Sequence, residues 1–340
     1  MVCILYVIAI GTLLGIAGLL VERTLPTTTT SRRWLWCTVI AITMTVPPIY
    51  NAKHRSSISD TLEQRVAEPG VGHSLATASL TALDEGLTAR ILGLNPVIHR
   101  GWIFASGMLV LWGLATAAQV AVLMRRSRNE SGTGVSAIVD GLPVVITDSI
   151  GPATVGVIRS RVVVPKWVLA LPGPQRRYVL RHEEEHRKSH DSLLLFVASI
   201  GLILAPWNLA LWWQLRRLRL AVEMDCDNRV VSALGDANAY GNLLFKVAQA
   251  ASRGPRLQPA FLGAGMLERR LTALLAPTPL KQAERFVLPI VACILLVIVL
   301  SMPHPVLTRS HAHGNSRSAA TVSDNTNTTH THAIAAKIDD

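Results

Sequence analysis

The sequence has few of the features that stabilise small secreted proteins. It contains only four cysteines in 340 residues. Three of them, Cys3, Cys37 and Cys293, lie in apolar stretches, where a thiol behaves as a small apolar side chain. We therefore expect no disulfide framework. No basic residue precedes the first apolar stretch, Val2–Val21, so this stretch does not resemble a cleaved secretory signal and is interpreted as a retained membrane anchor.

Acidic side chains are also scarce, with 22 Asp and Glu against 33 Lys and Arg and a net charge of +11. The basic excess is concentrated in Arg125–His190, whereas Asn51–Ile98 and Pro303–Asp340 are close to neutral. Short basic segments stay in the cytoplasm, so the excess is read as a topology signal. We predict contact with anionic lipid headgroups and no direct binding of nucleic acid.

Half of the residues are apolar and the mean hydropathy is +0.36, which is high for a soluble domain. If the basic segments lie inside and the neutral segments outside, the sequence predicts a multi-pass protein of the plasma (inner) membrane. Its N-terminus and C-terminal tail are then outside. The predicted parts are two spans with a short cytosolic loop (1–50), an extracytoplasmic loop (51–101), a third span (102–123), a cytosolic domain (124–285), a fourth span (286–302) and a disordered extracytoplasmic tail (303–340).

The stretch Arg181–Asp191 reads R-H-E-E-E-H-R-K-S-H-D and contains the pattern H-E-x-x-H at His182, Glu183 and His186. On a helix, residues four apart lie on one face, so both imidazoles can bind the same Zn²⁺. Glu183 would lie beside the open coordination position and act as general base on the attacking water. Pro172-Gly173-Pro174 favours a helix start just before the motif. The alternative is a solvated helix that carries two histidines by chance.

A zinc site with two histidines on one helix needs a third protein ligand, often a glutamate from a later helix. Glu223 lies 37 residues after His186 and is predicted to fill this role. Asp227, one turn further on the same face, could accept the second N–H of a ligand histidine. Cys226 is interpreted as a small buried residue, because a thiolate ligand would close the site. The alternative is an amphipathic helix with two solvated acids.

Three neighbouring features need separate interpretation. His190 follows His186 by four residues, but three turns of one helix do not easily surround a tetrahedral ion, so it is not predicted as a ligand. Asp191 is expected to anchor or close the helix end beside the ligands. The apolar run Leu193–Trp213 is interrupted by Pro206-Trp207-Asn208, which favours two short helices that dip into the cytoplasmic leaflet rather than a further span.

Short strands are predicted upstream of the motif, with a turn at Asp140-Gly141. An edge strand there could hold a peptide substrate in extended form, or the strands could only pack beneath the helix. The predicted strands are Ala137–Val139, Val144–Thr147, Val155–Ile158 and Val162–Val164.

Two further patterns have a structural and a functional interpretation. Gly11 and Gly15 allow close helix packing, either within the bundle or in a homodimer. His311-x-His313 and His330-x-His332 lie in a polar tail, for which disorder is favoured over metal sensing or transport.

These features together resemble the BlaR/MecR-type membrane zinc peptidases. The resemblance extends over Met1–Met302 and is most specific between Pro165 and Val231. It implies zinc ligation by two histidines and a glutamate, and regulated cleavage of a cytosolic winged-helix transcriptional repressor, or of the protein itself, after an outside signal. The matching residues are His182, Glu183, His186, Asp191, Trp207-Asn208, Arg216, Arg217, Glu223, Cys226 and Asp227.

One departure concerns the signal. The antibiotic receptors of this family carry an extracellular penicillin-binding domain after the fourth span, whereas Pro303–Asp340 is polar and has no S-x-x-K serine site. We therefore do not expect β-lactam sensing by acylation. A signal would enter through Asn51–Ile98, the tail, the spans or a partner protein.

The sequence thus predicts a mainly α membrane protein with four transmembrane helices and a cytosolic α+β, gluzincin-like zinc peptidase domain between the third and fourth. Its predicted partners are a cytosolic protein substrate and the lipid bilayer. Two other functions remain open: a signal transducer that binds a repressor without cutting it, and a membrane quality-control protease. Substitution of Glu183 separates the first alternative from a peptidase, and the range of substrates separates the second.

Overall fold

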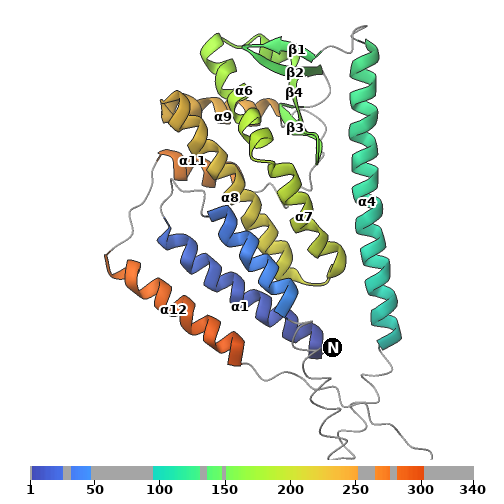
Figure 1. Ribbon diagram of the computed structural model, residues 1–340, viewed down its shortest axis with the longest axis vertical. Coiled ribbons are helices and arrows are strands. Elements are labelled where there is room, and N and C mark those ends of the chain that lie inside the picture. The colour runs from blue at the N-terminus through green and yellow to red at the C-terminus, as the bar shows by residue number, and fades with distance from the viewer. Residues whose placement is uncertain are drawn as a thin grey trace, which may run out of the picture. The chain divides into compact units, whose positions relative to one another are not determined.

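The computed structural model describes residues 2–25, 32–46, 95–130, 136–147, 151–251, 265–275 and 282–301. They belong to one compact unit, Met1–Pro305, and the second unit, Val306–Asp340, with both histidine pairs of the tail, lies outside them. Most of the predicted loop, up to residue 94, is outside them too. The elements (Figure 1) are α1 (Val2–Thr24), helix 32–46, α4 (Asn95–Glu130), β1 (Ser136–Val139), β2 (Leu142–Thr147), β3 (Ala153–Val155), β4 (Arg161–Pro165), α5 (Lys166–Leu169), α6 (Gly173–Lys188), α7 (Asp191–Leu204), α8 (Leu209–Leu234), α9 (Ala237–Ala251), α11 (Met266–Leu275) and α12 (Gln282–Ser301).

Helix α8 is the element that joins the two hydrophobic cores. It begins after Asn208, whose Oδ1 accepts hydrogen bonds from the N–H groups of Ala210 and Leu211 at 3.1 and 3.4 Å. It ends before Gly235, which has a φ of +74°. The preceding helix, α7, stops at Leu204. The predicted interruption of the apolar run is therefore confirmed.

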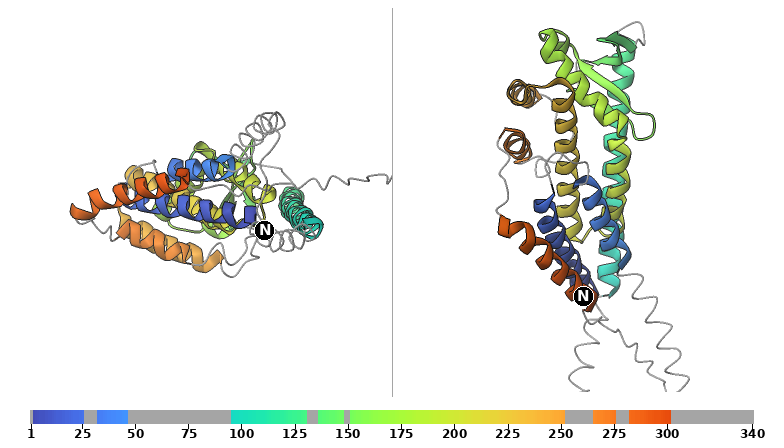
Figure 2. Two further views of the ribbon diagram at one scale, coloured as in Figure 1. Left: turned by 90° about the horizontal axis from the view of Figure 1, so that it is seen from below. Right: turned by 60° about the vertical axis from the view of Figure 1, so that its left-hand side comes forward.

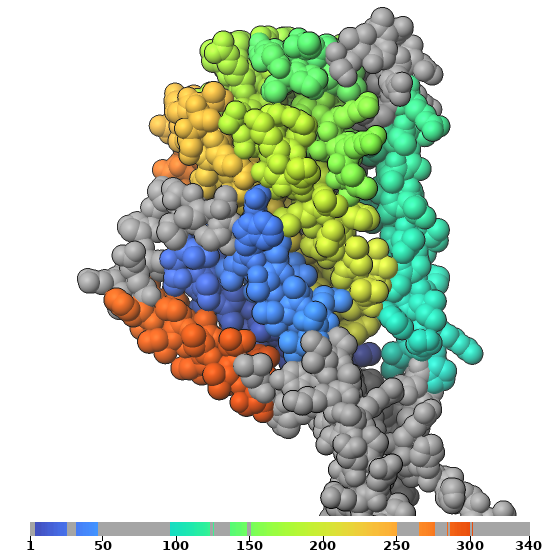
Figure 3. Space-filling model, in the orientation of Figure 1, coloured from blue at the N-terminus to red at the C-terminus, as the bar shows by residue number. Residues whose placement is uncertain are grey.

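The first core contains α1, helix 32–46, α7 and the N-terminal half of α8, with buried residues such as Trp36 and Leu218. Buried Gln214 of α8 donates hydrogen bonds to the carbonyl of Gly11, at 2.8 Å, and to Thr43 Oγ1, at 3.0 Å. Figure 2 shows α1 and α12 side by side, and the two helices are in contact. In the space-filling view of Figure 3, helix 32–46 lies at the surface and packs against the neighbouring elements.

The glycines of α1 are used for packing within the chain. A Cβ atom built on Gly11 would lie 3.0 Å from Ala210 Cβ, and one on Gly15 would lie 2.2 Å from the ring of Trp213. Close approach of α1 and α8 therefore requires both glycines, which favours the first of their two interpretations. A homodimer through Gly11 and Gly15 stays a prediction.

The second core lies between the sheet, α6, the C-terminal half of α8 and α9. It contains Val144, Val162, Leu180, Val230 and Leu243, each at most 3% exposed. The sheet has the strand order β1-β2-β4-β3, in which β2 and β4 are parallel and the outer pairs are antiparallel. The sheet therefore places β3 at an edge, next to α6.

Two predictions about the strands have different outcomes. Asp140 and Gly141 both have positive φ, 49° and 83°, as a tight two-residue hairpin requires, so the predicted turn is confirmed. The strand predicted at Val155–Ile158 is wrong in its bounds, because β3 ends at Val155, where the predicted strand begins. Gly156 follows with a φ of +112°, and a Cβ there would be 2.7 Å from the carbonyl oxygen of Arg159.

Two of the described helices are long and apolar enough to cross a membrane, at Ile4–Thr24 and Pro96–Val122. The apolar window in α4 has no buried residue, and Phe104, Leu111 and Leu114 are exposed. An exposed apolar face of this length is typical of a surface that contacts lipid or another protein. The apolar parts of α7 and α12, Asp191–Leu204 and Phe286–Val299, are shorter.

The helix boundaries correct three predictions. Asn95–Gly101, assigned to the outer loop, belongs to α4, because Pro96 in a first turn is compatible with a helix. The helix of the third predicted span does not end at residue 123 but continues as far as Glu130, since neither glycine nor proline interrupts it before Gly132. At the other end, α12 already begins at Gln282.

Candidate metal centre

Helix α6 carries the H-E-x-x-H motif between the sheet and α8. It has Pro174 in its first turn, as predicted. Tyr178, Val179 and Leu180 are buried in the second core, and the Tyr178 hydroxyl donates to the carbonyl of Gly235 at 2.9 Å. This packing fixes the rotation of α6, so that the side chains one turn later face α8.

Three predicted ligand atoms converge between α6, which carries the two histidines, and α8, which carries Glu223. The Nε2 atoms of His182 and His186 are 3.2 Å apart, and Glu223 Oε2 is 3.6 and 3.8 Å from them. Tetrahedral coordination with bonds of about 2.0–2.2 Å separates neighbouring ligand atoms by about 3.3–3.6 Å. The observed triangle agrees with this spacing to within a few tenths of an ångström. The three side chains therefore fit one zinc-sized ion without rearrangement of the backbone.

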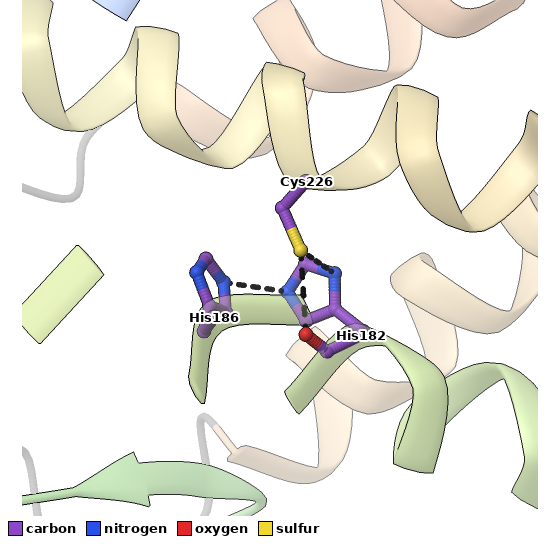
Figure 4. Close-up of side chains that lie close together, drawn as sticks. All are labelled: His182, His186 and Cys226. Carbon is purple, nitrogen blue, oxygen red and sulfur yellow. Dashed lines mark hydrogen bonds between the residues drawn. The ribbon is translucent and has the colours of Figure 1, made fainter. Parts of the chain in front are cut away.

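Cys226 is buried, but it also touches the histidines (Figure 4). Its Sγ is 3.3 Å from His182 Nδ1, and ligand atoms of His182, His186 and Cys226 all lie within 4.8 Å of one another. The thiol also donates to the carbonyl oxygen of His182 at 3.3 Å. The short sulfur contact is thus to Nδ1 of His182, whereas Glu223 approaches the two Nε2 atoms. Two possible ligand sets, one with Glu223 and one with Cys226, therefore share the two histidines.

The electrostatics of this cluster favour a cation. Burial lowers the pKa of an imidazole, but Cys226 and Glu223 raise the pKa of His182 to about 10. Burial also opposes ionisation of Glu223, but Arg270 and the two imidazoles hold its pKa well below the ordinary value. Both shifts arise because groups of opposite charge are packed together in one buried cluster. This donor set suits a divalent metal such as zinc, which would displace the protons.

Asp191 connects His186 to the first core. It is 2% exposed, and its Oδ2 is 2.8 Å from His186 Nδ1, which places an N–H donor of the ring against the carboxylate. Its Oδ1 accepts from Arg33 Nη1 at 3.1 Å. A carboxylate in this position fixes the ring so that Nε2 faces His182 and Glu223. Arg33 also lies 3.4 Å from Asp225, which pairs with Arg229 at 2.7 Å.

His182 is held by a different group. The Tyr240 hydroxyl is 2.9 Å from His182 Nδ1 and donates to Asp227 Oδ1 at 2.7 Å. Asp227 Oδ1 is itself 3.5 Å from His182 Nδ1, so the shorter connection runs through Tyr240. Arg270 donates to both oxygens of Asp227, at 2.8 and 2.7 Å. Its Nη1 also lies 3.0 Å from Glu223 Oε2.

Tyr240 and Arg270 were not predicted from the sequence. Each lies on a later helix, α9 or α11, at a distance along the chain that no motif spacing indicates. The only available signal was a polar residue on the apolar face of each helix, and this signal is common. His190, which was set aside as a ligand, is exposed, has a φ of +53° and precedes α7 instead of continuing α6.

Glu183 lies in the same cleft as the ligands and is 7% exposed. The hydroxyl of Thr154, on β3, donates to the Glu183 carbonyl oxygen at 2.7 Å and lies 3.2 Å from Oε2. The cleft has a volume of about 500 Å³, and its walls come from β3, α6, α7, α8, α9 and α11. A carboxylate, a cluster of metal-binding side chains and an edge strand therefore share one cavity.

The fold and site define a mostly helical protein with membrane-compatible helices and a metallopeptidase-type constellation. The family model described as BlaR1 peptidase M56 matches residues 5–274, so the chain belongs to this family of membrane-associated metallopeptidases. No curated protein sequence matches the chain significantly.

Proposed function

We propose that the protein is an integral membrane zinc metallopeptidase of the gluzincin type, in which His182, His186 and Glu223 hold the metal. The supporting observation is the triangle of Nε2, Nε2 and Oε2 atoms at tetrahedral spacing. Cys226 remains outside this set in the proposal, because a fourth protein ligand would occupy the position that a substrate needs. The zinc ion, when bound, polarises the scissile carbonyl and acidifies the attacking water.

The side chains of the cleft supply the remaining chemistry. Glu183 takes the proton from the attacking water and later gives it to the leaving amine. Thr154 restrains this carboxylate through its contact with Oε2. Asp191 and Tyr240 hold the two imidazoles in the tautomer that leaves Nε2 free for the metal.

The substrate is proposed to be a protein segment in extended form. Among the described strands, β3 has a neighbour on one side only, and Ala153 and Thr154 line the cleft beside Glu183. A peptide that pairs with the outer edge of β3 would pass through this cavity. Main-chain hydrogen bonds of this kind accept many sequences, so side-chain pockets would decide the cleavage site.

We further propose four transmembrane helices, in α1, helix 32–46, α4 and α12, with the metal centre on the cytosolic side. The support is the basic excess of Arg125–His190, which keeps this segment inside. A cytosolic winged-helix transcriptional repressor is the proposed substrate, with cleavage of the protein itself as a further step in signalling. The apolar hairpin of α7 and α8 would dip into the inner leaflet.

The test is a comparison of protein fragments in cells that carry the wild-type chain or Glu183→Gln. The wild type should produce a fragment of one regulator that the variant does not. Glu184→Gln is a matched control, because Glu184 is the next acid on α6 but pairs with Arg187 at 2.7 Å and does not line the cleft. Signalling that persists in Glu183→Gln would instead favour a binding-only transducer, and many unrelated substrates would favour quality control.

A further inference from the structure

A second cavity, of about 490 Å³, lies at the end of α1 and is rich in arginine. It is separate from the metal centre, with which it shares none of its lining residues. Helices α1, α8 and α11 and the start of helix 32–46 all contribute to it. Its polar lining consists of Arg23, Arg32, Arg217, Arg269 and Glu22, and Trp213 is part of its apolar wall.

The positive charge of this cavity is only partly neutralised. Glu22 is its single acid, and it pairs with Arg217 and accepts from Trp36 Nε1 at 3.0 Å. No carboxylate among the described residues pairs with Arg23 or Arg269. The Nε atoms of Arg32 and Arg217 are buried and have no hydrogen-bond partner in the described part of the chain. Four guanidinium groups around one acid repel one another unless an anion enters.

We propose that this cavity binds a phosphate-bearing anion. The guanidinium fork matches phosphate oxygens in geometry and charge, and several arginines can share one phosphate. The cavity lies where the apolar segment Ile4–Thr24 ends, which is the depth of lipid phosphates if α1 crosses the membrane. An acidic phospholipid therefore satisfies both the arginines and the apolar wall. A free phosphate compound offers the same chemistry from the cytosol.

The cavity and the metal centre are connected through α11. Arg269 lines the arginine-rich cavity, whereas its neighbour Arg270 pairs with Glu223 and Asp227. An anion bound by Arg269 would restrain the short helix that carries Arg270. Bound anion should therefore stabilise the protein as a whole, so that binding can be read from thermal unfolding.

The test uses the full-length chain, purified in a non-ionic detergent, with thermal unfolding measured against three titrants. These are phosphatidylglycerol, phosphatidylcholine and inorganic phosphate. The variants are Arg23→Gln, Arg269→Gln and both together, which remove exposed arginines without breaking an ion pair. Arg125→Gln is the matched control, because it is an exposed arginine just beyond the other candidate span.

Phosphatidylglycerol should raise the unfolding temperature and phosphatidylcholine should not. Each of the two substitutions should weaken the response about fivefold, while Arg125→Gln leaves it unchanged. An equal response to inorganic phosphate, lost in the same variants, would support the site with a free ligand as occupant. If no phosphate compound stabilises the wild type, or if the control weakens binding as much as the others, the site does not exist. Should the double variant not fold, Arg269→Gln alone gives the same comparison.

Discussion

The hydrogen bond between Asp191 and His186 gives a quantitative test of the metal centre. Asp191→Asn keeps the size of the side chain but removes its charge, so the acceptor of the His186 N–H weakens and Arg33 loses one of its two carboxylate neighbours. The imidazole is then free to rotate or to change tautomer. We expect the affinity for zinc to fall.

The structure sets the size of this effect. The bond is short, at 2.8 Å, and Asp191 is 2% exposed, so water cannot replace the lost charge. Loss of such a partner of a metal-binding histidine typically costs about 10–100-fold in metal affinity. This range corresponds to about 1.4–2.7 kcal/mol of binding free energy.

Asp225→Asn is the matched control for this measurement. Asp225 is 5% exposed and pairs with Arg33 and Arg229 in the same ion network, but no contact joins it to either histidine in the described structure. Both substitutions should lower stability, whereas only Asp191→Asn should lower zinc affinity. Competition with a chromophoric chelator at fixed pH measures the affinity, and thermal unfolding measures the stability. Equal zinc affinities in the two variants would refute the proposed role of Asp191.

Three further substitutions, the last with a matched control, test other parts of the structure. Tyr240→Phe removes the hydroxyl that holds one imidazole, and we expect about tenfold weaker zinc binding in the same competition assay. Cys226→Ser should leave zinc affinity within about threefold if the thiol is no ligand, whereas a loss of two orders of magnitude or more would assign the metal to the thiol set. Gly15→Ala places a methyl group against the ring of Trp213 and should cost about 1–3 kcal/mol in the free energy of unfolding, measured by chemical denaturation. Gly107→Ala, where a methyl group meets nothing within 4 Å, should not destabilise the protein.

Local patterns were the most predictable part of this chain. The start of α6 follows from Pro172-Gly173-Pro174, and the turn at Asp140-Gly141 follows from the residues that tolerate positive φ. The position of Glu223 was predictable because a helical hairpin returns the chain to the same place. These predictions depend on local residue preferences and on the spacing of motifs, both of which can be read from the sequence.

Contacts between distant elements were not predictable in the same way. Arg33 and Asp191 are 158 residues apart, and Tyr240 reaches His182 from 58 residues further along the chain. Such pairs depend on how whole helices are rotated and packed, and the packing involves many weak apolar contacts. From sequence alone, a charged residue at the start of an apolar helix can equally be interpreted as a topology signal. Arg33, at the start of helix 32–46, fits that interpretation, and the structure adds its contact with Asp191.

The candidate metal centre and the first core are connected by two series of contacts. Gln214 and Glu223 are nine residues apart on α8, about 14 Å along a rigid helix, and buried Gln214 is bonded to α1 and helix 32–46. The second series runs from Arg33, at the start of helix 32–46, through Asp191 to His186. Helix 32–46 therefore contacts α8, which carries Glu223, and reaches His186 on α6 through Asp191. Because tetrahedral ligation requires ligand atoms at defined spacing, we expect a displacement of these helices to change the fit of the proposed ligand atoms to one ion.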